Sequence, residues 1–164
     1  PKRELVANAK PKDNNAVGMG TLTMRVAPRG TISVDGAAKR IIGDEPTTML
    51  VSAGNRSVLF ENAKYGSKRI TVAMKPGATK QLTCYFESYA SISVSGGATW
   101  AMIVHNGQQT EQQAPIARFP LGPGKHSISV ARSGFETQEG EKEITVSPSF
   151  EEKVVRLAFT LKKK

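Results

Sequence analysis

The side chains of this chain that could carry bond chemistry are few and lie far apart in the sequence. The only histidines are His105 and His126, and the single cysteine, Cys84, is distant from both. Because a zinc site usually needs three or four ligands at suitable spacing, these residues do not predict a metal centre. Cys84 cannot form an internal disulfide, and its place on the apolar face of an expected strand predicts a small buried side chain.

Acid pairs of the kind that hydrolyse glycosides could be drawn from Asp35, Asp44 and Glu45. Asp35 stands before a glycine, where it favours a turn, and the other two acids precede Pro46 in a polar loop. The segment Gly18-Met19-Gly20 lacks the third glycine of a dinucleotide-binding loop. We therefore expect a protein without catalytic activity and without a bound cofactor.

The polar residues of the chain suit surface recognition better than catalysis. Residues 20–87 hold ten basic and five acidic side chains, a net charge of +5, whereas residues 88–161 hold six and seven, a net charge of −1. An anionic partner would therefore prefer the first segment or the basic ends of the chain. The expected contact residues are Arg29, Lys39, Arg40 and Asp44 in the first segment, and Trp100, Gln108 and Gln109 in the second.

Trp100 is the only tryptophan, and two interpretations of it stay open. Its indole could stack on a sugar or anchor a protein partner, because an aromatic side chain offers a large contact area. A position in the hydrophobic core is the favoured alternative.

The elements that must position these residues occur twice along the chain. Ile32-Ser33-Val34-Asp35-Gly36 and Ile103-Val104-His105-Asn106-Gly107 each combine an alternating strand with a turn dipeptide. Such a duplication predicts two copies of one small β unit. Further landmarks follow in the same order: Pro46, Gly54, Val58, Tyr65, Ile70, Val72 and Pro76 in the first copy, and Pro115, Gly124, Ile128, Phe135, Ile144, Val146 and Pro148 in the second.

Composition and spacing predict an all-β chain of two tandem, small, antiparallel β-sandwich domains, Ig-like in type. The 164 residues include 15 glycines and 9 prolines, and only 6% are aromatic. We expect a flexible basic linker over 1–19, the first domain over 20–87, the second over 88–161 and a basic tail over 162–164. A domain of about 70 residues buries roughly 60% of its unfolded surface, enough for a small core. The sequence contains no run of 18 apolar residues, so it does not predict a membrane-spanning helix.

The two copies differ in loop length, and loops are where binding specificity is usually located. The stretch from Phe135 to Ile144 is four residues longer than the stretch from Tyr65 to Ile70. The early loop from Gly97 to Gly107 is also longer than its counterpart in the first copy.

The order of these motifs resembles the PEGA domain, over about residues 20–161. That family has a Pro-x-Gly-Ala-like turn, a Val-x-Asp-Gly hairpin, a proline before a strand, a Gly-x-His/Arg-x-Val step and an aromatic after a small residue. In the first copy the name-giving glutamate is replaced by Arg29 and the alanine by Thr31. The matching residues are Pro28-Arg29-Gly30-Thr31, Val34-Asp35-Gly36, Pro46, Gly54 to Val58 and Lys64-Tyr65 in the first copy, and Ser95-Gly96-Gly97-Ala98, His105-Asn106-Gly107, Pro115, Gly124 to Ile128 and Gly134-Phe135 in the second.

The resemblance implies tandem small β-sandwiches outside the bacterial cytoplasm, often within larger membrane-attached envelope proteins, and it supplies no catalytic residue. We therefore expect a non-catalytic binding or spacer module that recognises a protein or an envelope polymer through loops and strand edges. Any membrane attachment would use a segment outside this chain. Two alternatives are the extracytoplasmic sensor region of a transmembrane Ser/Thr kinase, and a polyanion or nucleic-acid binder.

Overall fold

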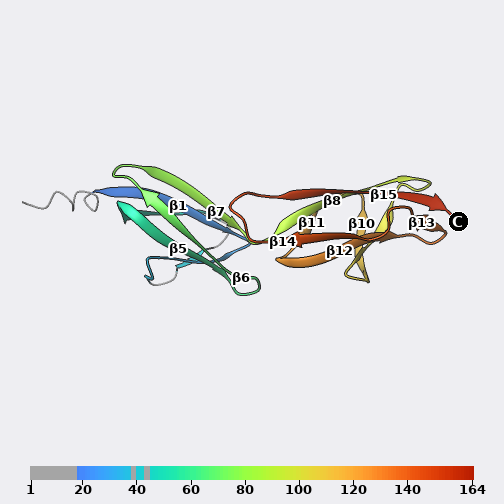
Figure 1. Cartoon of the computed structure of the whole chain (residues 1–164), viewed down its shortest axis with the longest axis horizontal. Coiled ribbons are helices and arrows are strands. Elements are labelled where there is room, and N and C mark those ends of the chain that lie inside the picture. The colour runs from blue at the N-terminus through green and yellow to red at the C-terminus, as the bar shows by residue number, and fades with distance from the viewer. Residues whose placement is uncertain (1–17, 38–39, 43–44) are drawn as a thin grey trace, which may run out of the picture. The chain divides into compact units, whose positions relative to one another are not determined.

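The computed structural model describes residues 18–37, 40–42 and 45–164, with backbone only for 40–42 (Figure 1). These residues form strands, turns and loops, with no helix among them, so the predicted all-β, sandwich-like fold is confirmed. The described residues divide into two compact units, with the division between Cys84 and Tyr85. This division comes three residues before the boundary expected from the sequence. No described helix is long and apolar enough to cross a membrane.

The first unit contains two sheets, drawn in blue to green in Figure 1. One sheet has the strand order β4-β1-β7 and the other the order β3-β2-β5-β6. Each strand ends at a turn or loop rich in glycine, proline or polar residues. The strands are β1 (Met19–Ala27), β2 (Gly30–Val34), β3 (Arg40–Ile42), β4 (Thr47–Ser52), β5 (Gly54–Asn62), β6 (Gly66–Met74) and β7 (Thr79–Tyr85).

The second unit also contains two sheets, with orders β11-β8-β15-β13 and β10-β9-β12-β14. Its first and last long strands, β8 and β15, pair in parallel, and β15 includes Lys162 and Lys163, which the sequence alone assigned to a tail. The strands are β8 (Ser88–Gly96), β9 (Ala101–His105), β10 (Gln108–Ala114), β11 (Ile116–Leu121), β12 (Gly124–Ala131), β13 (Phe135–Thr137), β14 (Lys142–Val146) and β15 (Val154–Lys163).

The two units share one connectivity. Strands β1 to β5 correspond in order to β8 to β12, while β6 and β7 correspond to β14 and β15. Only β13 has no separate counterpart, and it arises in the segment that is longer in the second copy. Instead of continuing beside β12, this short strand pairs with β15 in the opposite sheet.

Alternating side chains from both sheets fill each core. In β1, Leu22, Met24 and Val26 are buried, while the residues between them are partly exposed. In β15, Leu157, Phe159 and Leu161 are buried in the same manner. The second core joins both sheets of its unit, with the members Ala90, Ile92, Ala98, Ala101, Ile103, Ala114, Phe119, Leu121, Ile128, Val130, Val146, Leu157, Phe159 and Leu161.

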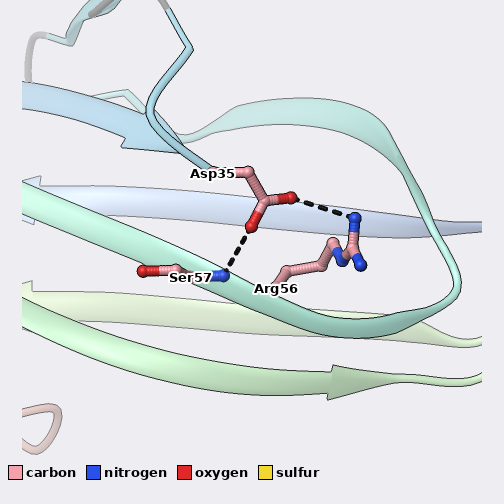
Figure 2. Close-up of polar contacts among 3 residues, drawn as sticks. All are labelled: Asp35, Arg56 and Ser57. Atoms are coloured by element: carbon pink, nitrogen blue, oxygen red, sulfur yellow. Dashed lines mark hydrogen bonds and ion pairs between the residues drawn. The ribbon is translucent and has the colours of Figure 1, made fainter.

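One side-chain clip recurs at the first hairpin of each unit, and Figure 2 shows the clip of the first unit. Asp35 has a φ of 51°, and its Oδ1 accepts a hydrogen bond from the Ser57 backbone N–H at 2.8 Å. Its Oδ2 accepts a second bond from Arg56 Nη1 at 3.0 Å. In the second unit Asn106 also has a φ of 51°, and its Oδ1 accepts from the Ser127 N–H at 2.8 Å. Asp and Asn fit this position because both tolerate a left-handed backbone and bond locally.

The sheet register corrects one match between the copies. Gly54 pairs with Met74 across β5 and β6, whereas Gly124 pairs with Val146 across β12 and β14. Val146 therefore occupies the position of Met74, and not that of Val72 as the sequence pattern suggested. A strand repeats every two residues, so a slip of two leaves its alternation unchanged and hides the error.

Candidate functional site

Each unit has a surface pocket beside the turn that ends its long strand, β5 or β12. The first pocket has a volume of about 650 Å³ and the second about 630 Å³. The first is lined by Arg29, Gly30, Thr31, Glu61, Asn62, Ala63, Gly66 and Ser67. The second is lined by Trp100, Met102, Gln109, Val130, Ala131, Arg132, Ser133, Phe135, Glu136, Thr137 and Lys164.

The two pockets occupy the same place in the repeated fold. Arg29 is the residue immediately before β2, and Trp100 is the residue immediately before the corresponding strand β9. Asn62 is five residues after Ser57, and Arg132 is five residues after Ser127, the matching serine of the hairpin clip. Arg29 and Trp100 are therefore structural equivalents, and so are Asn62 and Arg132, although the residue types differ within each pair.

A matching hydrogen bond joins these equivalents in each unit. Asn62 Nδ2 donates to the backbone oxygen of Arg29 at 2.9 Å. Arg132 Nη1 donates to the backbone oxygen of Trp100 at 3.1 Å. In both units a side chain from the β5 or β12 turn thus fixes the backbone that enters the second sheet. Because the acceptor is a main-chain oxygen, residue 29 or residue 100 can change its side chain without removing this bond.

The buried Asn62 organises the first pocket. Its side chain is only 9% exposed, so its polar atoms need partners within the protein. Besides the bond from Nδ2, its Oδ1 accepts from the backbone N–H groups of Lys64 at 2.8 Å and Tyr65 at 3.0 Å. These bonds set the β5–β6 turn and leave the exposed Arg29 beside the opening.

The second pocket is aromatic and cationic. The Arg132 guanidinium carbon lies 4.3 Å from the ring centroid of Trp100 and 5.2 Å from that of Phe135. These distances allow favourable cation–π contacts. Trp100 nevertheless keeps 39% of its surface exposed, so it is not the core residue that the sequence favoured. Arg132 covers part of the indole, and the rest faces solvent.

The path of β13 brings further groups to the second pocket. Phe135 pairs with Lys163 of β15, and the Lys164 N–H donates to the backbone oxygen of Gly134 at 3.0 Å. A side chain at Gly97 would place its Cβ 3.0 Å from the Phe135 ring, so a glycine there permits the close approach. The path of β13 therefore places the Phe135 ring in the pocket wall, and its pairing with β15 brings Lys164 to the same pocket.

Of the seven expected contact residues, three line the pockets, two lie elsewhere on strands, and two lie outside the described residues. Arg29, Trp100 and Gln109 line the pockets, whereas Gln108 is exposed at the start of β10 and lines neither. Arg40 begins the short strand β3, and its backbone pairs with Ile32 of β2. The remaining two candidates, Lys39 and Asp44, lie outside the described residues.

Sequence reasoning did not identify the residues that complete the pockets. Phe135 was recognised only as a landmark of the repeat, and Lys164 only as part of a basic tail. Asn62 and Arg132 gave no signal, because equivalent positions with different residue types do not look repeated. Counting positions from Ser57 and Ser127 would have aligned them.

The two histidines form a hydrogen-bonded pair on the second sheet of the second unit. His105 Nε2 lies 2.8 Å from His126 Nδ1, and His126 Nε2 lies 2.6 Å from the backbone oxygen of Gly122. Because that oxygen can only accept, His126 in its neutral form donates to it from Nε2–H, and its Nδ1 then accepts from His105 Nε2–H. Burial, and then the nearby His126, lower the pKa of His105. The described residues contain no cluster of three or more metal-ligating side chains.

Comparison with known proteins gives no family for this chain. No protein-family model matches it, and no curated protein sequence matches it. A solved structure titled "The Bacillus anthracis TIE protein" aligns with 90% of the chain at 15% sequence identity and a TM-score of 0.34. This chain spans about a third of the length of that protein, because the alignment covers 34% of it.

Proposed function

We propose that this chain is a non-catalytic binding and spacer module of a bacterial envelope protein, located outside the cytoplasm. It recognises a protein or an envelope polymer through the loops and strand edges around its two equivalent pockets. The motif order that resembles PEGA domains supports the location and the membrane-attached context. Attachment to the membrane would use a segment outside this chain.

The observation that carries this proposal is the recurrence of an open pocket at one position of a duplicated fold. The Asn62–Arg29 and Arg132–Trp100 hydrogen bonds maintain the same backbone, while the exposed side chain differs. A purely architectural turn would need only the shared backbone bond. An exposed arginine in one copy and a partly exposed tryptophan in the other instead suit contact with a partner.

The proposal is tested by co-sedimentation of the purified chain with isolated bacterial envelopes. Trp100→Ala should raise the dissociation constant by about 30-fold, because truncating an aromatic anchor typically costs about 2 kcal/mol. Arg29→Ala should weaken binding less, because an exposed charge contributes less. Leu50→Ala is the matched control, since Leu50 is an exposed apolar residue, 65% accessible, that lines neither pocket.

Circular dichroism should give the same spectrum for all three variants, since each change removes a surface side chain. Absence of binding by the wild-type chain, or equal binding by the wild type and both pocket variants, would overturn the proposal. A loss with Leu50→Ala alone would move the contact surface away from the pockets.

A further inference from the structure

We propose that the pocket of the second unit binds an acidic sugar chain, with a pyranose ring on the indole of Trp100 and an anionic group beside Lys164. This inference rests on the proposed binding function and adds the chemical class of the ligand. The first-unit pocket is excluded from it, because Arg29 stands where the indole would be needed.

The indole is a preformed platform. Arg132 stacks on it at 4.3 Å and also bonds to the Trp100 backbone oxygen at 3.1 Å. Both contacts hold the loop and the ring before any ligand arrives, which lowers the entropy lost on binding. The C–H face of a pyranose is apolar and slightly positive, so it complements the negative face of an aromatic ring.

The polar groups around the platform match a polyhydroxylated ligand. Gln109 offers a planar amide that both donates and accepts, and Glu136 offers a carboxylate that accepts. Both are exposed, and both line the same pocket as Trp100. The volume of about 630 Å³ also lies in the range of about 300–1,000 Å³ typical of small-ligand pockets.

The pocket is more positively charged than the rest of its unit. Outside the charged residues that line the pocket, residues 85–164 hold seven basic and seven acidic side chains, a net charge of zero. Among the side chains that line the pocket, Lys164 and Arg132 contribute two positive charges against the one negative charge of Glu136. Lys163 adds a further exposed lysine, because it pairs with Phe135 of the pocket wall. This local excess of positive charge favours an anionic ligand.

A single-stranded nucleic acid would combine negative charge with stacking, but it uses successive aromatic platforms along a basic groove. The second pocket offers one exposed indole, and its other ring, Phe135, is more buried than Trp100. An acidic oligosaccharide needs one platform per bound ring, so it fits this arrangement better.

The chain contains an internal probe for this test, because Trp100 is its only tryptophan. Intrinsic tryptophan fluorescence therefore reports on this pocket alone. The full chain is titrated with galacturonic acid trimer, with the neutral glucose trimer cellotriose, and with short-chain polyphosphate, at 50 and 500 mM salt. We expect a saturable emission change with a midpoint at least fivefold lower for the acidic trimer than for cellotriose. The difference should shrink at high salt, because exposed charges are then screened.

A pair of variants separates the role of charge from that of stacking. Lys164→Gln retains the backbone bond to Gly134 and should abolish the preference for the acidic trimer. Lys80→Gln removes an exposed lysine of the first unit and should leave the titration unchanged. Trp100→Ala, followed by calorimetry because its fluorescence is lost, should bind neither trimer.

Each remaining result decides against the inference. Equal midpoints for the two trimers would overturn the acidic preference, and an equal response to polyphosphate would show that charge alone acts. If neither trimer changes the emission while envelope binding still depends on Trp100, the sugar class is wrong and the binding function stands. If envelope binding is also independent of both pockets, the proposed function itself fails.

Discussion

The clip at Asp35 should be a main determinant of stability in the first unit. The substitution Asp35→Ala removes the acceptor of the Ser57 N–H bond at 2.8 Å, and a hydrogen bond to a charged group contributes about 1.5–3 kcal/mol. It also places alanine at a φ of 51°, which adds about 1 kcal/mol of backbone strain. The ion pair to Arg56 adds at most about 1 kcal/mol, because the two side chains are 27% and 41% exposed.

The expected loss for Asp35→Ala is therefore about 3–5 kcal/mol. That is a large share of the roughly 4–10 kcal/mol available to a unit of this size. Asp35→Asn should cost no more than about 1 kcal/mol, because asparagine retains the acceptor and tolerates the left-handed backbone. The second unit uses Asn106 for the same bond at 2.8 Å, which is the structural precedent for this variant.

The assay uses Cys84, the single thiol, which is buried in β7 of the first unit. Pulsed thiol labelling at increasing urea concentration measures exposure of Cys84 as this unit unfolds. With a slope of about 1–2 kcal/mol per molar urea, Asp35→Ala should lower the labelling midpoint by roughly 2 M or more. Equal shifts for Asp35→Ala and Asp35→Asn, or a shift below 0.5 M (about 1 kcal/mol) for Asp35→Ala, would refute the assigned role of the clip.

Three further predictions follow from single residues. Gly96→Ala should destabilise the second unit by about 3 kcal/mol, because Gly96 has a φ of 89° and an added Cβ would meet a backbone oxygen of β15. Gly107→Ala should cost only about 1 kcal/mol, because Gly107 has a φ of 79° but open space around it. Chemical denaturation followed by Trp100 emission would show this difference, and equal losses of stability would contradict it. Because burial and then His126 lower the folded-state pKa of His105 below 6.5, the unfolded state binds more protons there, so stability should fall as the pH drops from 7 towards 5. His105→Val, which copies the residue of the first unit, should flatten that pH dependence in urea titrations, and an unchanged slope would assign it elsewhere. Burial raises the pKa of the Cys84 thiol to about 11, so at pH 8 its labelling in the native protein should be roughly 100-fold slower than in urea. Comparable rates would show that the thiol is accessible.

Turn dipeptides and alternating apolar residues predicted the parts of the fold that depend on neighbouring residues in the sequence. Asp35-Gly36 and Asn106-Gly107 marked two hairpins because these residue types tolerate the positive φ that the turns require. Alternation identified the buried faces of β1 and β15. The all-β class and its tandem organisation followed from these two kinds of signal.

The remaining features depend on contacts between distant residues. The transfer of β13 to the opposite sheet is set by its pairing with Lys163 and by the close approach of Phe135 to Gly97, neither of which has a local sequence pattern. Trp100 was expected in the core because large apolar side chains are usually buried there. It lies at the surface because Arg132, from a different strand turn, packs against it.

The parallel pairing of β8 and β15 determines how the second unit bears a pulling force. Their ladder joins eight residue pairs, from Val154–Tyr89 to Leu161–Gly96. Because the two strands run in the same direction, the chain enters the unit at one end of this ladder and leaves it at the other. Tension on the two ends would slide the strands past each other and strain all of these pairs together, whereas peeling would open them one at a time. A module with this geometry can act as a tether that resists extension until the whole ladder ruptures.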